Sequence, residues 1–197
     1  MTDEKIIIPY KVQKGNRPKI EEVIIYCLYG GMQKAALDFA AWMRDNKMPL
    51  KIGSSSTRNH GAFYKGEQIC TVLLYAGENE IYLDQRRSGE RLCWTITPKL
   101  AHIDKYEKVA ISEGLQNILW DNVNICQNHS GNKMGCSPDK RCAGGRDFTI
   151  LGKEFHGVKW CYPHSTVKNP DEATISGIKM LIDLERQARD GSANQIP

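Results

Sequence analysis

One stretch of 40 residues, 125–164, constrains this chain more than any other part. It reads ICQNHSGNKMGCSPDKRCAGGRDFTILGKEFHGVKWCYPH and holds four of the seven cysteines and three of the five histidines. Zinc prefers tetrahedral sites of nitrogen and sulfur ligands, and structural zinc sites are usually made of four protein side chains. We expect a structural zinc ion here, bound by Cys126, Cys136, Cys142 and Cys161, with His129 as an alternative ligand.

The residues between Cys126 and Cys142 are rich in Gly, Ser, Asn and Pro and offer little apolar surface to bury. A bound metal would order such a loop, since structural zinc contributes about 10–16 kcal/mol in small sites. The gaps between the four cysteines, nine, five and eighteen residues, match no common zinc motif. Free thiols in a reducing compartment and disulfides in a secreted protein therefore stay open as alternatives. The odd cysteine count and the lack of a signal-peptide pattern count against disulfides.

A catalytic zinc would keep one coordination position open and would need an acid–base group nearby. Glu154, His156 and His164 are within range along the sequence. However, the chain has no His-Glu-x-x-His motif and no His-x-Glu with Pro-Cys-x-x-Cys. We therefore interpret Glu154 and His156 as exposed strand residues and His164 as a loop residue, and we assign no catalytic residue.

Composition and charge set wider limits. With 197 residues, of which 41% are hydrophobic, the chain fits one domain, or one domain with a metal-bound appendage. The formal net charge is +4, and four thiolates on one zinc ion would add −4 + 2 = −2, which leaves +2. That charge is too mild to indicate nucleic-acid binding by itself. No apolar run approaches the roughly 18 residues of a membrane span, so we expect a cytoplasmic protein without a membrane partner.

Helical periodicity follows a flexible lead-in over residues 1–16. Apolar residues at i, i+3, i+4, i+7 and i+8 predict a helix that starts near Pro18 and ends at Gly30 and Gly31; they are Ile20, Val23, Ile24, Cys27 and Leu28. A second helix is predicted over residues 32–47, with a buried stripe of Ala36, Phe39, Ala40 and Met43.

Alternating residues between Leu50 and Pro98 predict an antiparallel meander of about four strands, one face of which packs on these helices. Cys70 and Cys93 are expected opposite one another as buried thiols. The polar residues 53–60, GSSSTRNH, enter this sheet. Together with two later arginines they could line an anion pocket, with a solvated loop as the alternative. The candidate ligand-binding residues are Arg58, His60, Arg86 and Arg87.

The C-terminal part is predicted to contain short helices, a hairpin and a long helix. A capping box begins a helix over residues 105–111, and Ser112 caps another. A hairpin is predicted to turn at Gly152-Lys153 and to bring Cys142 and Cys161 together. Asn169 is predicted to cap the closing helix, whose stripe and C-terminal cations are Ile175, Ile178, Leu181, Ile182, Glu185, Arg186 and Arg189.

Three segments, ALDFAAWMRDNKMP, FYKGEQICTVLL and ILGKEF, together resemble a family of uncharacterised bacterial proteins of similar length and order of elements. The resemblance covers most of residues 32–185. It implies a shared fold and a bacterial cytoplasmic setting. It implies no activity, because none is known for that family.

These patterns predict an α+β fold, in which an antiparallel meander packs on helices and is followed by a metal-stapled loop and hairpin and a closing helix. The expected parts are an α+β domain over residues 17–125, a cysteine-rich loop and hairpin over 126–168, and a closing helix and tail over 169–197 that completes the first part. The first functional hypothesis is a zinc-stabilised binding module for a small molecule or a protein partner. Its site would be the sheet face or residues 53–60.

Two other functions stay open. Residues 126–168 carry seven basic side chains against three acidic ones, and aromatic residues there could stack on bases. A nucleic-acid-binding protein is therefore the second hypothesis; the residues are Lys133, Lys140, Arg141, Arg146, Lys153, Lys159 and Lys168, against Asp139, Asp147 and Glu154, with Phe155, Trp160 and Tyr162. A thiol- or zinc-dependent enzyme is the third.

Overall fold

A computed structural model describes residues 18–53, 59–75, 92–126, 145–159 and 165–191. The chain divides into two compact units. The first consists of Met1–Ile96 with Lys168–Ser176, and the second of Thr97–Val167 with Gly177–Pro197. The cysteine-rich part that the sequence predicts over residues 126–168 stays a prediction.

The structure contains helices and an antiparallel sheet, so the predicted α+β class is confirmed. Its helical elements are α2 (Ile20–Cys27), α3 (Gly30–Asp45), η1 (Ile103–Lys105), α4 (Glu107–Ser112), α5 (Gln116–Trp120) and α6 (Glu172–Asp190). Its strands are β1 (Lys51–Ile52), β2 (Asn59–Tyr64), β3 (Glu67–Leu74), β4 (Trp94–Pro98), β5 (Arg146–Ile150), β6 (Lys153–Val158) and β7 (Val167–Lys168).

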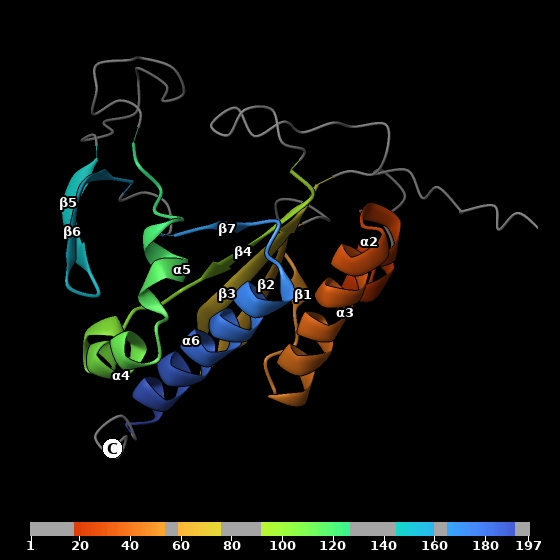
Figure 1. Ribbon diagram of the computed structural model, residues 1–197. Coiled ribbons are helices and arrows are strands. Elements are labelled where there is room, and N and C mark those ends of the chain that lie inside the picture. Colours follow the sequence, from red (N-terminus) through yellow and green to blue (C-terminus); the bar gives the residue numbers. More distant parts are fainter. Residues whose placement is uncertain (1–17, 54–58, 76–91, 127–144, 160–164, 192–197) are drawn as a thin grey trace, which may run out of the picture. The chain divides into compact units, whose positions relative to one another are not determined.

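Five strands form one sheet in the order β1-β2-β3-β4-β7, and β5 and β6 form a second (Figure 1). The predicted meander is therefore extended by β7, a short strand from the C-terminal part of the chain. One of the four strands expected from the alternating pattern, which contains Ile81 and Leu83, lies outside the described residues.

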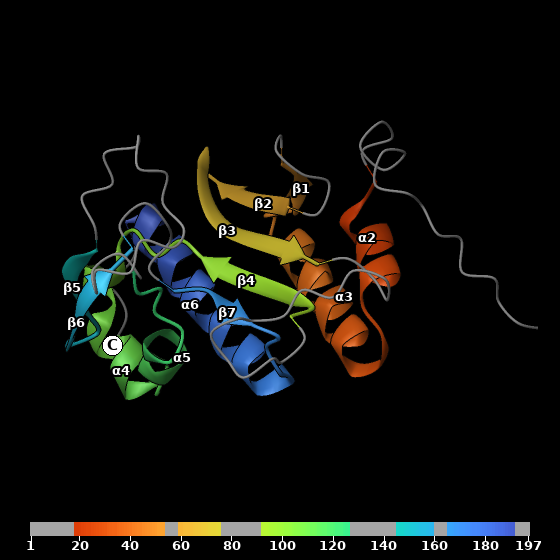
Figure 2. The ribbon, with the colours of Figure 1, turned by 90° about the horizontal axis from the view of Figure 1, so that it is seen from above.

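Helices α2 and α3 lie side by side in the first unit (Figures 1 and 2). Helix α2 buries the face that its spacing predicted, namely Ile20, Val23, Ile24 and Cys27. The prediction that Gly30 ends this helix is wrong. Leu28 is already extended (φ −120°, ψ 157°), and Gly30 begins α3 with φ +57°. A positive φ strains other residues far more than glycine, so Gly30 allows the tight connection between the helices.

Strands β2 and β3 form a hairpin around the two-residue turn Lys65-Gly66, which the sequence predicted. Both turn residues have positive φ (49° and 83°), as a type I′ hairpin turn requires. Asn59 and His60 belong to β2 and pair with β3, so the polar segment 53–60 is not a loop throughout.

The two cysteines of this sheet are not opposite one another, contrary to expectation. Cys70 pairs with Ala62 of β2. The carbonyl oxygen of Cys93 accepts a hydrogen bond from the N–H of Tyr75 at 2.9 Å. Tyr75 directly follows the last residue of β3, so Cys93 lies beside the C-terminal end of β3. Cys70 lies five residues earlier along the chain, so the two cysteines are not opposite one another.

Helix α6 begins two residues later than a cap at Asn169 implies. The cap is Asp171, whose Oδ1 accepts a hydrogen bond from the N–H of Thr174 at 2.8 Å. Asn169 has φ +41°, and its side-chain oxygen accepts hydrogen bonds from the N–H groups of Cys93 (2.8 Å) and Trp94 (3.2 Å). Asn169 therefore binds the start of β4 through its side chain, and Asp171 caps α6 in its place.

The second unit has its own core, which joins α4, α5, the β5–β6 hairpin and the later part of α6. Its buried residues are Tyr106, Ala110, Leu115, Leu119, Ile150, Leu151, Leu181, Leu184 and Ala188. The hairpin turns at Leu151-Gly152, one residue before the predicted place. Leu151 has φ +47°, a left-handed conformation that costs a non-glycine residue about 1–2 kcal/mol. Burial of its side chain in this core offsets that cost.

Candidate functional site

The described part of the cysteine-rich stretch contains Cys126, which is buried at the end of an extended segment. Two backbone hydrogen bonds join this segment to the end of β6: Cys126 N–H donates to Gly157 O at 2.7 Å, and Lys159 N–H donates to Asn124 O at 2.7 Å. An antiparallel bridge pairs Ile125 with Val158 between them. Residues 124–126 therefore act as a third strand beside β6 in the second unit.

The start of β5 reaches the same place. Arg146 pairs with Val158, and Gly145 lies against Gly157 so closely that a Cβ atom on Gly145 would be 2.2 Å from the Gly157 carbonyl oxygen. Only glycine fits this contact. Three points of the backbone thus converge at one end of the hairpin: Cys126, Gly145 and the segment around Gly157.

The other predicted zinc ligands, Cys136, Cys142, Cys161 and the alternative His129, lie outside the described residues. Within the residues that are described, no group of three or more His, Cys, Asp or Glu side chains could hold a metal ion. The zinc site therefore stays a prediction, and so does the stapling of the hairpin.

Of the four predicted ligand-binding residues, the structure describes His60 alone. Its side chain is fully buried (0% exposed), on β2 opposite Val72. Arg58, Arg86 and Arg87 lie outside the described residues. The anion pocket is thus untested, and His60 would reach an anion only if that anion were itself buried.

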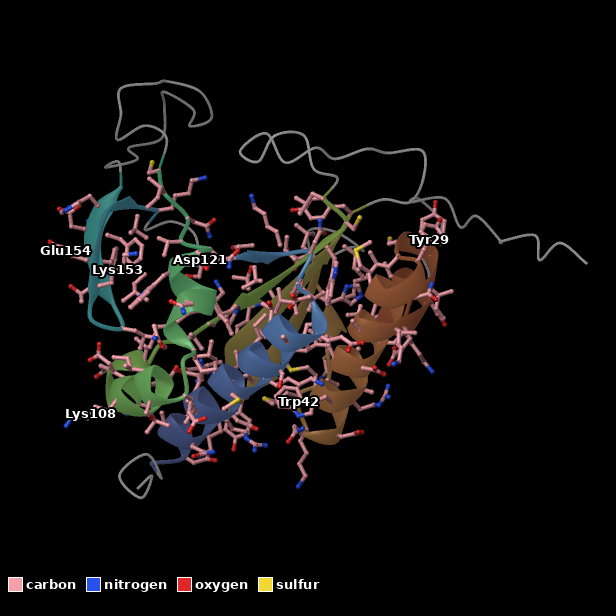
Figure 3. All side chains as sticks on the ribbon, in the orientation of Figure 1. Tyr29, Trp42, Lys108, Asp121, Lys153 and Glu154 are labelled. Carbon is pink, nitrogen blue, oxygen red and sulfur yellow. The ribbon has the colours of Figure 1, made fainter. Side chains whose placement is uncertain are left out.

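The hairpin shows how some of the predicted basic and aromatic residues are used. Lys153 points toward α5, and its Nζ lies 5.1 Å from the ring centroid of Trp120 and 5.2 Å from that of Phe155 (Figure 3). Phe155 packs against the core of the second unit, and Glu154 points away from it. These contacts occupy Lys153 and Phe155 within the fold.

The charges of the described hairpin are nearly balanced, with Arg146, Lys153 and Lys159 against Asp147 and Glu154, or 3 − 2 = +1. As expected, Glu154 and His156 are exposed strand residues. His156 Nδ1 lies 3.2 Å from Asp147 Oδ2, with both side chains more than half exposed. The remaining basic and aromatic residues of the nucleic-acid hypothesis, apart from Lys168 in β7, lie outside the described residues.

A buried polar cluster in the second unit surrounds the carboxylate of Glu185, which is 0% exposed. Its Oε1 accepts hydrogen bonds from Arg189 Nε at 2.8 Å and His102 Nδ1 at 3.0 Å. Its Oε2 accepts from the Tyr106 hydroxyl at 2.9 Å and from the backbone N–H of His102 at 3.0 Å. Each carboxylate oxygen therefore has two donors, which is what a buried carboxylate needs. We call these four residues the Glu185 cluster.

Protonation in the Glu185 cluster follows from these contacts. Burial by itself would raise the pKa of Glu185, but the hydrogen bonds from His102, Arg189 and Tyr106 outweigh it and hold this pKa below its ordinary value. Burial, followed by the neighbouring Glu185 charge, raises the pKa of the Tyr106 hydroxyl far above its ordinary value. The carboxylate is therefore ionised and the phenol neutral near pH 7.

Sequence reasoning placed Glu185 on the buried stripe of α6 and Arg189 near the end of that helix, and both placements are confirmed. It did not find His102 and Tyr106. They lie 83 and 79 residues before Glu185, and no local pattern signals a contact over that distance. The one available signal was an acidic residue on an apolar stripe, since a buried carboxylate must have partners.

No helix within the described residues combines the length and apolar character needed to cross a membrane. Comparison with known proteins adds no identity: no family model matches the chain, nor does any curated protein or solved structure. The resemblance to a bacterial family consequently remains an expectation from three short segments.

Proposed function

We propose that the chain is a zinc-stabilised α+β binding module, in which Cys126, Cys136, Cys142 and Cys161 hold a structural zinc ion. His129 is the alternative fourth ligand. The observation that carries this proposal is the convergence of Cys126, Gly145 and Gly157–Lys159 at one end of the hairpin.

Chain length supports the proposal. Cys142 precedes Gly145 by three residues, and Cys161 follows Lys159 by two. Since an extended residue spans at most about 3.6 Å, each cysteine stays within roughly 7–11 Å of its anchor. The anchors adjoin Cys126, so four thiolates could reach one ion, with Zn–S distances of about 2.3 Å, without any change to the hairpin. Cys136 and His129 lie between Cys126 and Cys142 in the sequence, and a bound metal would hold that segment.

Binding, the module's proposed role, would use the first unit. Its strand β2 carries Phe63, which is 49% exposed and lies three positions after the end of the polar segment 53–60. A half-exposed aromatic ring can anchor a small molecule or a short segment of a protein partner. Phe63→Ser should then abolish ligand-induced increases in Tm across a small-molecule library while leaving the zinc content unchanged.

The test of the zinc site is metal content together with thiol counting on the full chain purified without added zinc. We expect about one zinc per chain. Chelation should release four reactive thiols, or three if His129 is a ligand. Cys126→Ser should lose the metal or one of its sulfur ligands, whereas the control Cys93→Ser, a cysteine of the first unit, should keep the metal and all its ligands. A chain with no metal and seven titratable thiols would refute the proposal and favour a thiol-based enzyme.

Nucleic-acid binding is the second candidate, supported by the excess of basic residues over 126–168. The use of Lys153 and Phe155 within the fold weakens it. Counterion release makes such binding fall steeply with salt. Retention of generic DNA or RNA at low salt, lost at high salt, would support it, and no retention at low salt would exclude it.

A further inference from the structure

His102 is held against Glu185 at two points. Its backbone N–H donates to Oε2 at 3.0 Å, and its ring nitrogen Nδ1 lies 3.0 Å from Oε1. The carboxylate is itself fixed by Tyr106 and by Arg189, whose Nη2 also donates to the carbonyl oxygen of Lys99 at 3.3 Å. The imidazole therefore has a set position and orientation.

This contact also sets the tautomer of the imidazole. An ionised carboxylate only accepts hydrogen bonds, so in the neutral imidazole Nδ1 carries the proton and Nε2 carries the lone pair. The His102 side chain is 30% exposed. Nε2 has no hydrogen-bond partner among the described residues. It is also absent from the buried polar atoms of those residues that lack a partner, so it is accessible to solvent. A buried carboxylate thus lies behind a ring whose lone pair is open to solvent.

We propose that His102 is a nucleophilic histidine, whose Nε2 takes the acyl group of an activated carboxylic acid derivative such as an ester, thioester or anhydride. The Nε2 lone pair forms a bond to the acyl carbon, and the leaving group departs with its electron pair. The Nδ1 proton, hydrogen-bonded to Glu185 during the attack, then passes through solvent to the leaving group. Water hydrolyses the resulting acyl-imidazole, which releases the acid and restores the ring.

The chain supplies a matched control in His156. Its Nδ1 also faces a carboxylate, Asp147, but the two side chains are 68% and 56% exposed. Water and salt screen that pair. If access alone decides reactivity, His156 reacts faster than His102. If the buried carboxylate decides it, the order reverses.

The test is the rate of ethoxycarbonylation of each histidine by diethyl pyrocarbonate, an acyl electrophile, at pH 8 in the full chain. Peptide mass spectrometry gives the rate at each site, in the native state and in urea. The native rate divided by the unfolded rate corrects for the local sequence. We expect this ratio to be larger for His102 than for His156. A ratio for His102 equal to or below that for His156 would overturn the proposal, and this comparison needs no variant.

A second arm tests the carboxylate. Glu185→Gln keeps the side-chain shape and removes the charge, and it should slow the labelling of His102 about tenfold, the factor that corresponds to one charge-assisted hydrogen bond. Asp147→Asn should leave His102 unaffected, and His102→Gln confirms the assignment of the labelled peptide. Circular dichroism checks that the Glu185→Gln variant is folded. An unchanged His102 rate in folded Glu185→Gln would also contradict the proposal.

Discussion

A carboxylate that is removed from water must be hydrogen-bonded or neutralised, and Glu185 is hydrogen-bonded on both oxygens. The four donors come from three residues, two of which precede Glu185 in the chain by 83 and 79 positions. A buried charged group of this kind adds little when compared with an apolar side chain of the same shape, but removal of one partner is expensive. Substitutions of single residues in the Glu185 cluster are therefore informative.

Glu185→Gln should lower the free energy of unfolding by about 3 kcal/mol, because the guanidinium of Arg189, 5% exposed, loses its counter-charge. Urea denaturation of the full chain measures the change. The control Glu154→Gln replaces an exposed glutamate of the hairpin and should change stability by less than about 0.5 kcal/mol. Equal effects of the two substitutions would show that the cluster contributes nothing.

The same cluster predicts how stability depends on pH. The pKa of Glu185 is lower in the folded than in the unfolded chain, so its contribution is complete above the ordinary value of about 4.3 and is lost as pH falls through the folded pKa. The pKa of Tyr106 is raised, so its contribution is lost as pH rises beyond about 10. The difference in Tm between the wild type and Glu185→Gln should thus shrink as pH falls below about 4. A difference that grows in acid would contradict this assignment.

At the scale of elements, one glycine determines how α6 approaches α5 in the second unit. A Cβ atom on Gly177 would lie 2.2 Å from Ile118 Cδ1 and 3.3 Å from Leu115 Cδ2. Alanine is about 1 kcal/mol better than glycine inside a helix, whereas such overpacking costs about 1–3 kcal/mol. Ile118 packs against the core cluster that contains Leu115, which limits how far its side chain can move, so Gly177→Ala should destabilise the chain in thermal unfolding.

The neighbour Ile118 makes this prediction specific. Ile118→Val removes Cδ1, so Gly177→Ala should cost less in the Ile118→Val background than in the wild type. Ser176→Ala, an exposed position one residue earlier, serves as the control for helix propensity. Stabilisation by Gly177→Ala in the wild-type background would mean that the helices do not meet at this position.

The start of α6 gives a second prediction at this scale. Asp171→Ala removes the cap and should cost about 1 kcal/mol. Asn169→Ala removes the acceptor for two backbone N–H groups and should cost more, roughly 2 kcal/mol. The two variants are compared by urea denaturation. A larger loss of stability in Asp171→Ala than in Asn169→Ala would show that capping of α6 is the main role of this segment.

These elements show what the sequence could predict. The periodicity of α2 and α3, the turn at Lys65-Gly66 and the hairpin near Gly152 depend on neighbouring residues, and local patterns found them. Asn169 has the composition of a helix cap, but its side chain binds residues 75 and 76 positions away. Gly30 has the composition of a helix end, but its positive φ begins the next helix. Asparagine and glycine each suit two backbone roles, and the local sequence does not decide between them at these positions. At Asn169 the contacts that decide are distant in the sequence.

At the scale of the whole molecule, the same limit applies to the candidate sites. The sequence predicted that the ends of the β5–β6 hairpin lie together, and the backbone contacts of Cys126, Gly145 and Gly157 agree with that geometry. It did not predict the Glu185 cluster, since that cluster depends on packing between segments that are distant along the chain.

X-ray absorption at the zinc edge, on the full chain purified without added metal, tests the proposed zinc site most directly. We predict a bound zinc with about four sulfur ligands at roughly 2.3 Å, or three sulfurs and one nitrogen if His129 takes part. The Cys126→Ser variant should lose the metal or one of these sulfur ligands. A chain that contains no zinc, or one whose zinc has only oxygen and nitrogen neighbours, would contradict the account.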